Sequence, residues 1–430
     1  MDFFLKDSIA VADGKTINTT AIQKSIDICH AAGGGRVIVS GGTYVTGTII
    51  LKSNVEIYIE ADGKLLGSPY CEDYPERQNV RHVKSKLLPR GRNACLIFAE
   101  EAENIGIGGP GVIDGNGQNF VRELTEEERD TKRPVRWRYK RIDAPTPPRV
   151  VFFAGCRNVK VTDVSMMNQP AGWSYWIHDC DYVTFDRCKI VADLQYPNND
   201  GIHVNSSRNV TISNCLISCG DDCIVVRANN SSLSKNKVCE KVTVTNCNLT
   251  SYSSGIRVGW INDGVIRNCS FSNIVMTDTL NAVSIRLPGR TSPERIQDEG
   301  REATLVENLS FNNIVMDRIF GYPINISISR LPMTKCLAIR NIYFSDFHVR
   351  GSHMPHIVGR EDCPVENIHF THCSFEVCSS DTETESDADP TVMKLEMVNG
   401  ITMTDTTFCN MTIGKQTDPD VVMIHNKLGN

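Results

Sequence analysis

The chain contains 430 residues, 40% of them apolar, and its formal net charge is −6. This acidic balance argues against nucleic acid or an anionic membrane as the main partner, and no apolar run approaches the roughly 20 residues of a membrane-spanning helix. The chain does not begin with a basic region followed by an apolar stretch, so we expect no signal peptide and a cytoplasmic protein, or a secreted one if a signal has been removed.

The first hundred residues begin with a predicted helix. Residues 19–29 carry apolar side chains at helical spacing and start with a capping Thr. Three glycines at 33–35 follow the helix, which fits a turn at its C-terminal end better than a phosphate-binding loop. Strands are expected at 36–39 and 48–51. The helix should cover the open end of a repetitive fold, because terminal repeats must hide their core from water.

A repeated phrase fills the chain from about residue 104 onward. It consists of a polar or Asn residue, a short alternating strand, Asn/Asp-Cys-x-hydrophobic and a turn, as in 209–215 and 242–247. Copies recur at roughly 23 to 33 residues, with one interval of about 44. This period, with short strands and no helical periodicity, is typical of a β-solenoid rather than of a leucine-rich repeat or a propeller.

We therefore predict an all-β, single-domain, right-handed parallel β-helix of about ten coils with an N-terminal capping helix. The domain should span residues 1–430, with residues 1–100 as the cap and first coils and residues 101–430 as the remaining coils. Asn residues recur at the turns, and their side-chain amides should hydrogen-bond to one another between stacked coils.

The cysteine pattern indicates core residues. Seventeen cysteines occur without a C-x-x-C pair. Many recur at one phase of the repeat and should form an internal column: Cys156, Cys180, Cys188, Cys215, Cys247, Cys269 and Cys373. Because a free cysteine behaves as a small apolar side chain, we predict reduced core cysteines, a reducing compartment and no metal site.

Three long interruptions break the repeat, at 118–148, 287–304 and 379–389. The acidic segment 379–389 suits a solvated surface loop. The segment 287–304 fits either a cleft wall or a plain surface loop. The segment 118–148 is expected to line a cleft, because Trp137 lies among arginines that suit a sugar face and a carboxylate.

Three aspartates lie in two consecutive copies of the repeat, just before its short apolar strand: Asp200 in one copy, Asp221 and Asp222 in the next. Stacked strands are about 4.8 Å apart, so the three carboxylates should share one site. Grouped carboxylates serve acid/base cleavage of a glycosidic bond, and one of them should keep its proton because its neighbours are charged. Both Asp221 and Asp222 can face one cleft only if the chain bends, which Gly220 permits.

These residues resemble glycoside hydrolase family 28, the polygalacturonase family of pectin hydrolases, over most of the chain. Segments 33–37 and 109–115 are similar to the family's, Asn198-Asn199-Asp200 stands where the family has Asn-Thr-Asp, and Gly220-Asp221-Asp222 is intact. The resemblance implies that Asp221 is the general acid, that Asp200 and Asp222 activate water, and that the anomeric configuration is inverted. It also implies a pectic carbohydrate as partner and no cofactor.

Two other motifs of the family are altered. Ser253-Ser254-Gly255 stands in place of Gly-His-Gly, and Ser284-Ile285-Arg286 in place of Arg-Ile-Lys. In the family the His helps to order the carboxylates, and the Arg/Lys pair holds the galacturonate carboxylate. Here Arg257 and Arg286 are candidates to supply two positive charges from neighbouring positions. Further candidates for substrate contact are Asn198, His203, Ser254 and Trp176.

Three functions fit these residues. The first is an exo-acting glycoside hydrolase on pectin-derived saccharides. The second is a β-helix polysaccharide lyase or uronate epimerase, which the loss of the His and Arg favours and the paired carboxylates oppose. The third is a non-catalytic carbohydrate-binding β-helix.

Overall fold

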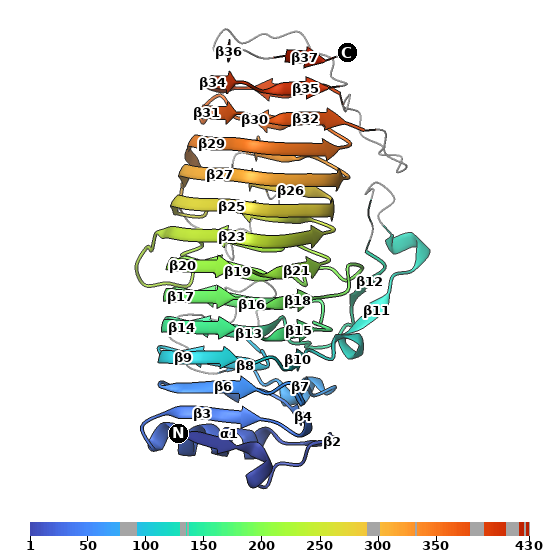
Figure 1. The fold of residues 1–430 in the computed structure, drawn as a ribbon, viewed down its shortest axis with the longest axis vertical. Helices are drawn as coiled ribbons and strands as arrows, with labels where there is room; N and C mark the ends of the chain where they lie inside the picture. Colours follow the sequence, from blue (N-terminus) through green and yellow to red (C-terminus); the bar gives the residue numbers. More distant parts are fainter. Residues whose placement is uncertain are drawn as a thin grey trace.

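The computed structural model describes residues 1–77, 93–129, 135, 137–289, 302–331, 333–378, 391–409, 421–424 and 427–429. Short strands stack along one long axis, with the N-terminus at one end and the C-terminus at the other (Figure 1). Neighbouring strands pair in parallel through both large sheets. The predicted right-handed parallel β-helix is confirmed. The segment 379–389 and most of 287–304 lie outside the described residues.

The larger sheet contains two rows of strands that merge in four long ones. The first row contains β1 (Asp2–Phe4), β3 (Gly35–Val39), β6 (Val55–Ile59), β9 (Glu103–Gly108), β14 (Arg157–Thr162), β17 (Asp181–Asp186), β20 (Arg208–Ser213), β31 (Val365–Thr371), β34 (Val398–Thr404) and β36 (Val421–Ile424). The second contains β2 (Asp13–Ile17), β4 (Gly42–Thr46), β7 (Gly63–Gly67), β10 (Val112–Asp114), β15 (Ser165–Met167), β18 (Lys189–Val191), β21 (Leu216–Cys219), β32 (Ser374–Val377), β35 (Thr407–Cys409) and β37 (Lys427–Gly429). The long strands β23 (Cys239–Ser251), β25 (Val265–Thr279), β27 (Thr304–Ile319) and β29 (Cys336–Gly351) run through both rows.

The smaller sheet carries the predicted site. Its strands are β5 (Ile49–Ile50), β8 (Ile97–Glu100), β13 (Arg149–Ala154), β16 (Trp173–His178), β19 (Ile202–Asn205), β22 (Ile224–Arg227), β24 (Ser254–Val258), β26 (Asn281–Leu287), β28 (Ile324–Ile328), β30 (His356–Val358) and β33 (Lys394–Glu396), paired in that order. Because side chains alternate along a strand, one set faces the core and the other faces outward.

One outward-facing set is register-paired from strand to strand along this sheet. We call it the outer row: Ile50, Phe98, Phe152, Trp176, His203, Val225, Arg257, Ser284, Asn325, His356 and Lys394. Their strand neighbours, such as Ile202 and Val204 in β19, are fully buried in the main core.

Asparagine ladders link neighbouring coils, as the sequence predicts, although this one lies inside long strands. Asn246, Asn273 and Asn313 occupy corresponding positions in β23, β25 and β27 with φ between 51° and 56°, a left-handed conformation that Asn tolerates well. The amide of Asn273 donates to Asn246 Oδ1 at 3.3 Å, and the amide of Asn313 donates to Asn273 Oδ1 at 2.9 Å. Each ladder thereby replaces exposed amides with bonds between coils.

Helix α1 (Thr19–Ala31) packs at the N-terminal end against β3 and β5 (Figure 1). The predicted Thr cap is wrong, because the capping residue is Asn18, whose side chain bonds to Val11 and Thr16 instead of the helix. The glycine turn is confirmed, since Gly33 and Gly34 have φ of 95° and 113° and the Gly34 N–H donates to the Cys29 carbonyl. Single-turn 3-10 helices occur at η1 (Leu5–Asp7), η2 (Cys71–Asp73), η5 (Gly117–Phe120) and η6 (Glu126–Glu128).

The cysteine prediction is confirmed in part. Fifteen cysteines are free, and twelve of those are buried. The predicted single column is divided, because Cys156 lies beside Cys180, Cys215 lies between Cys188 and Cys247, and Cys269 pairs in register with Leu309. Cys336 and Cys363 are joined by a disulfide, which corrects the prediction of reduced cysteines for this pair. The reducing compartment stays a prediction.

Candidate active site

The turns before β19 and β22 bring the three aspartates together. The two strands pair in parallel with His203 opposite Val225, so the turns that precede them are stacked. The Gly201 N–H donates to the Asp222 carbonyl at 3.0 Å and ties one turn to the next. Only 5%, 9% and 7% of Asp200, Asp221 and Asp222 is exposed. Three acids that are nearly removed from water therefore occupy two adjacent coils.

Two glycines allow this close approach. A Cβ atom at Gly220 would lie 2.2 Å from the Tyr196 carbonyl oxygen, and one at Gly201 would lie 2.3 Å from the Cys223 carbonyl oxygen. Either contact is far inside van der Waals range, so both positions require glycine. The backbone of one turn thus packs directly on the next.

Asparagines of the first turn hold the second. Asn199 Oδ1 accepts the N–H groups of Gly220 at 2.7 Å and Asp221 at 3.2 Å. The backbone N–H and the side-chain amide of Asn198 donate to Asp221 Oδ2 at 3.0 and 3.2 Å. Asn198, a predicted substrate contact, therefore binds the Asp221 carboxylate. Sequence reasoning missed the role of Asn199, although the Asn-Asn-Asp motif contained it.

Asp200 differs from the other two acids. Its Oδ1 atom is buried without a hydrogen-bond partner. Burial raises the pKa of Asp200 well above its usual range, and the charges of Asp221 and Asp222 raise it further. Burial and the neighbouring charges thus favour the protonated form of Asp200, and the neutrality of one of the three grouped acids stays a prediction.

His203 lies directly beside Asp200. Its Nδ1 atom is 3.6 Å from Asp200 Oδ2, and its ring packs on Trp173 with centroids 4.0 Å apart. Burial lowers the pKa of His203 well below its usual value, with the positive charges of Arg227 and Arg149 acting in the same direction. The neutral imidazole contacts the aspartate cluster and leaves little surface for a sugar, because only 3% of His203 is exposed.

Trp176 lies in an aromatic cluster and not on an open surface. It stacks on Phe152 at 4.3 Å between centroids, and Phe152 meets Phe98 edge to face at 5.3 Å. The Arg149 guanidinium lies 4.1 Å from the Trp176 ring centroid. Trp176 is 4% exposed, whereas Trp173 is only partly buried. Of the two tryptophans, Trp173 therefore offers more surface to a ligand.

Two arginines flank the acids on the C-terminal side. Arg257 packs on Trp260, 4.6 Å from the ring centroid, and donates to the carbonyls of Gly259 and Arg286 at 3.3 Å. Burial lowers the pKa of Arg257 to about 10, so the side chain stays charged at neutral pH, and the negative charge of Asp222 opposes this shift. The Nε atom of Arg286 is buried without a hydrogen-bond partner. Arg286 as a whole is only partly buried, so its charged side chain is a candidate to bind an anion.

The serines at the altered motifs bond in two directions. Ser254 Oγ donates to Ser284 Oγ at 3.2 Å, so these two residues form a pair on adjacent coils. Ser253 Oγ donates to Asp222 Oδ1 at 2.8 Å. Sequence reasoning selected Ser254 and missed this contact of Ser253, because the pairing depends on register between coils.

The described part of the 118–148 interruption reaches the turn that carries Asp221 and Asp222. Its strands β11 (Val121–Glu123) and β12 (Tyr139–Arg141) form an antiparallel pair. The indole N–H of Trp137 donates to the Gly220 carbonyl at 2.6 Å, directly before Asp221. Tyr139 packs edge to face on Tyr196, with centroids 5.0 Å apart. This segment therefore forms a wall beside the acids.

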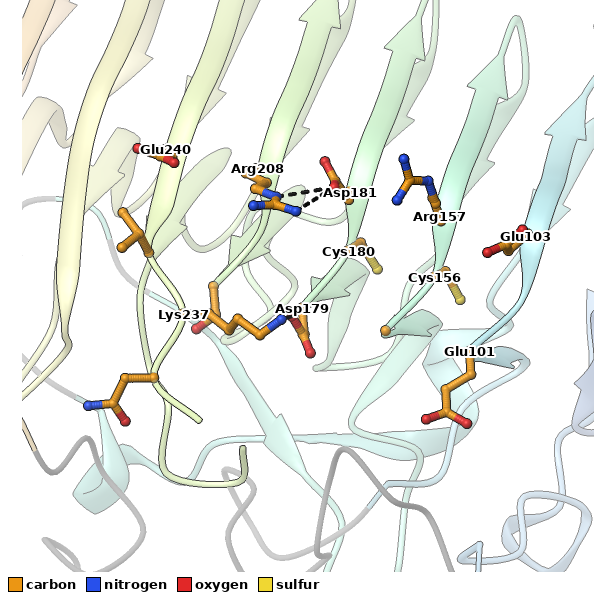
Figure 2. A pocket seen from close by; sticks show the side chains of 14 residues that line it. Glu101, Glu103, Cys156, Arg157, Asp179, Cys180, Asp181, Arg208, Lys237 and Glu240 are labelled. Carbon is orange, nitrogen blue, oxygen red and sulfur yellow. Dashed lines mark hydrogen bonds and ion pairs between the residues drawn. The ribbon is translucent and has the colours of Figure 1, made fainter. Parts of the chain in front are cut away.

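A separate polar pocket of about 510 Å³ lies at the other end of the same strands, where β16 and β19 finish. Two ion pairs lie among its lining residues, Arg208 with Asp181 and Lys237 with Asp179 (Figure 2). None of the three grouped aspartates lines this pocket.

No group of three or more His, Cys, Asp or Glu side chains among the described residues is arranged to hold a metal ion. No helix in that part of the chain is long and apolar enough to cross a membrane.

Comparison with known proteins links the chain to carbohydrate-active enzymes. The model for glycosyl hydrolases family 28 matches residues 81–355. A probable polygalacturonase of Arabidopsis thaliana is 24% identical over 356 residues, 76% of this chain and 70% of that protein. An exo-poly-alpha-D-galacturonosidase of Dickeya chrysanthemi is 27% identical over 252 residues, 50% of this chain and 40% of its own length. The structure of an exopolygalacturonase from Thermotoga maritima shares the fold, with a TM-score of 0.68 and 20% identity over 98% of this chain and 91% of that one.

Proposed function

We propose a substrate and a mechanism from the premise that the chain belongs to glycosyl hydrolases family 28 and is a glycoside hydrolase. The substrate is a pectin-derived oligo- or polysaccharide built from galacturonate or a related sugar. The similarity to a probable polygalacturonase and to an exo-poly-alpha-D-galacturonosidase supports this class. The single observation that carries the proposal is the burial of Asp200, Asp221 and Asp222 in two stacked turns.

In the proposed reaction, Asp221 protonates the leaving oxygen while the bond from this oxygen to the anomeric carbon breaks. Water adds to the opposite face of the anomeric carbon, and its proton passes to Asp222 or Asp200. Inversion follows, because acid and base act on opposite faces of the sugar. Ser253 Oγ donates a hydrogen bond to Asp222 Oδ1, so one oxygen of this proposed base is held by the protein.

The proposed acid, Asp221, must carry a proton before the reaction begins. Burial and two neighbouring charges raise the pKa of Asp200, so this residue carries a proton before substrate binds. Asp221 accepts N–H bonds from Asn198 and from Asp222, which favour its charged form. Asp221 must therefore take the proton of Asp200 before it acts as the acid, which leaves Asp200 ionised and able to accept the proton of the water. In the reversed assignment, Asp200 is the general acid. The two assignments differ in which variant, Asp221→Asn or Asp200→Asn, recovers its rate on a substrate with an activated leaving group.

Arg257 and Arg286 are proposed to read a substrate carboxylate. Both stay charged while partly removed from water, and the Arg286 Nε lacks a partner. A guanidinium binds a carboxylate through two parallel hydrogen bonds, which is stronger than contact with a neutral sugar. Exo action is proposed because aromatic side chains fill the N-terminal side of the outer row, next to the acids.

The experiment is a panel of pectic oligosaccharides of increasing length, with the products identified by mass and retention. We expect monosaccharide release from one chain end and no product that absorbs in the ultraviolet. An unsaturated product would establish a lyase, and binding without turnover would establish a carbohydrate-binding β-helix. A random distribution of long fragments would contradict exo action alone.

A further inference from the structure

One hydrogen bond crosses from the coil after the aspartate pair to an acid of the site. Ser253 Oγ donates to Asp222 Oδ1 at 2.8 Å. Ser253 directly precedes β24, and Asp222 lies shortly before β22, the strand with which β24 pairs. Three stacked turns therefore meet at the site: the turns of Asp200, of Asp221 and Asp222, and of Ser253.

The backbone of Ser253 is itself held in place. Its N–H donates to Ser251 Oγ at 2.8 Å, and Ser251 Oγ donates to the Asp221 carbonyl at 2.5 Å. The Ser251 N–H donates to Thr279 Oγ1 of the following coil at 3.1 Å. This chain of hydroxyl groups ties both aspartates of the pair to the next two coils, so the Ser253 hydroxyl has a defined position.

We propose that Ser253 is a positioning residue for Asp222, which rests on the proposed role of Asp222 as a water-activating base. A bond to Oδ1 fixes the rotation of the carboxylate and leaves Oδ2 to aim at the water. A general base must lie within hydrogen-bond reach of the proton it takes, so a small rotation is costly. A serine hydroxyl does not titrate in the working range and stays a donor at every pH of interest.

The neighbouring serine does not share this role. Ser254 Oγ points to Ser284 Oγ on the next coil. Of the two consecutive serines, Ser253 thus bonds to the Asp222 carboxylate and Ser254 bonds to a serine of the neighbouring strand. The assignment to Ser253 therefore depends on the contact that the structure shows and not on the altered motif alone.

The test compares Ser253→Ala with Ser253→Thr, which keeps the hydroxyl, and with a matched control. In the control, Ser213→Ala removes a bond from Ser213 Oγ to Asp186 Oδ1 that is also 2.8 Å long but lies in the larger sheet. We expect Ser253→Ala to lower kcat by about 10- to 100-fold, the scale for a hydrogen bond to a charged group, with KM nearly unchanged. Ser253→Thr should restore most of the rate, and Ser213→Ala should keep it.

A crystal structure of Ser253→Ala supplies a readout that needs no substrate. The proposal predicts a rotated Asp222 carboxylate with the turn backbone unchanged. An unmoved carboxylate, or full kcat in Ser253→Ala, would overturn the proposal. If the wild-type enzyme hydrolyses no pectic saccharide, the proposed function fails, and the orientation of Asp222 still decides the role of Ser253.

Discussion

The outer row differs on the two sides of the catalytic turns. On the N-terminal side it contains Phe98, Phe152 and Trp176, which pack as a buried cluster separate from the main core. On the C-terminal side the same row contains Arg257, Ser284, Asn325, His356 and Lys394. One sheet with one register thus presents a filled apolar half and a polar, cationic half. The difference supports the proposal that the arginines on the C-terminal side bind a substrate carboxylate.

The largest expected effect tests the filled half. Phe152→Ala removes a ring that stacks on Trp176 and meets Phe98 edge to face. We expect the free energy of unfolding to fall by about 3–5 kcal/mol, the usual cost of a cavity left by phenylalanine. Ser284→Ala in the other half should cost about 1 kcal/mol or less, because it removes a single hydroxyl contact. If Phe152→Ala and Ser284→Ala lowered the free energy of unfolding in urea by the same amount, the two halves would not differ in packing.

The next effect concerns the acids at the boundary. Asp221→Asn should lower turnover by at least about a hundredfold, since general acid help is usually worth that much. If Asp221 is the acid, a substrate with an activated phenolic leaving group should recover much of the rate in Asp221→Asn and little in Asp222→Asn. Recovery in Asp200→Asn instead would transfer the acid role to Asp200.

The third prediction tests whether the cationic half binds the carboxylate of the substrate. Arg286→Ala should lower kcat/KM by about 2–3 kcal/mol of charge-assisted bonding on a galacturonate substrate. A carboxyl-reduced substrate should show little change. Arg208→Ala is the control, because Arg208 pairs with Asp181 on the surface of the larger sheet. The same loss on both substrates would show that Arg286 does not bind the carboxylate.

The smallest effect concerns stability and pH. Native Asp200 binds its proton more tightly than Asp200 of the unfolded chain does. As the pH rises above the ordinary pKa of 3.8, the unfolded chain loses this proton more readily, so the free energy of unfolding falls. Asp200→Asn should therefore raise the free energy of unfolding near pH 7 by about 1–3 kcal/mol, the penalty of an unsatisfied buried group. The gain should shrink as the pH falls toward 4. If Asp200→Asn were less stable than the wild type at neutral pH, the raised pKa assigned to Asp200 would be contradicted.

The sequence predicted the features that repeat. The repeat period predicted the coils, and recurring Asn residues such as Asn246 and Asn273 predicted the ladders. Both predictions were possible because every copy of the repeat adopts the same local geometry. Asp200, Asp221 and Asp222 were found by their place before a strand. Contacts between coils were harder to find. Whether Ser253 or Ser254 meets Asp222 depends on register and rotamer, which one copy of a repeat does not reveal.

The same limit explains the other differences. Trp173 and Trp176 differ by three positions in β16, so they lie on opposite faces of an ideal strand, yet both rings contact the Arg149 guanidinium. Burial of Trp176 depends on what covers the row, which spacing does not encode. The Cys336–Cys363 pair is 27 residues apart, about one coil, and a column of cysteines at one phase gave no sign that these two would bond.

The most direct test of the proposed mechanism is the anomeric configuration of the first product. Proton NMR during hydrolysis of a pectic oligosaccharide distinguishes the two anomers before they equilibrate. The account predicts that the released sugar first appears with the configuration opposite to that of the bond cleaved, because a water molecule activated by Asp222 or Asp200 attacks the face opposite the leaving oxygen. A retained configuration would require a covalent intermediate and would contradict the roles assigned to the three aspartates.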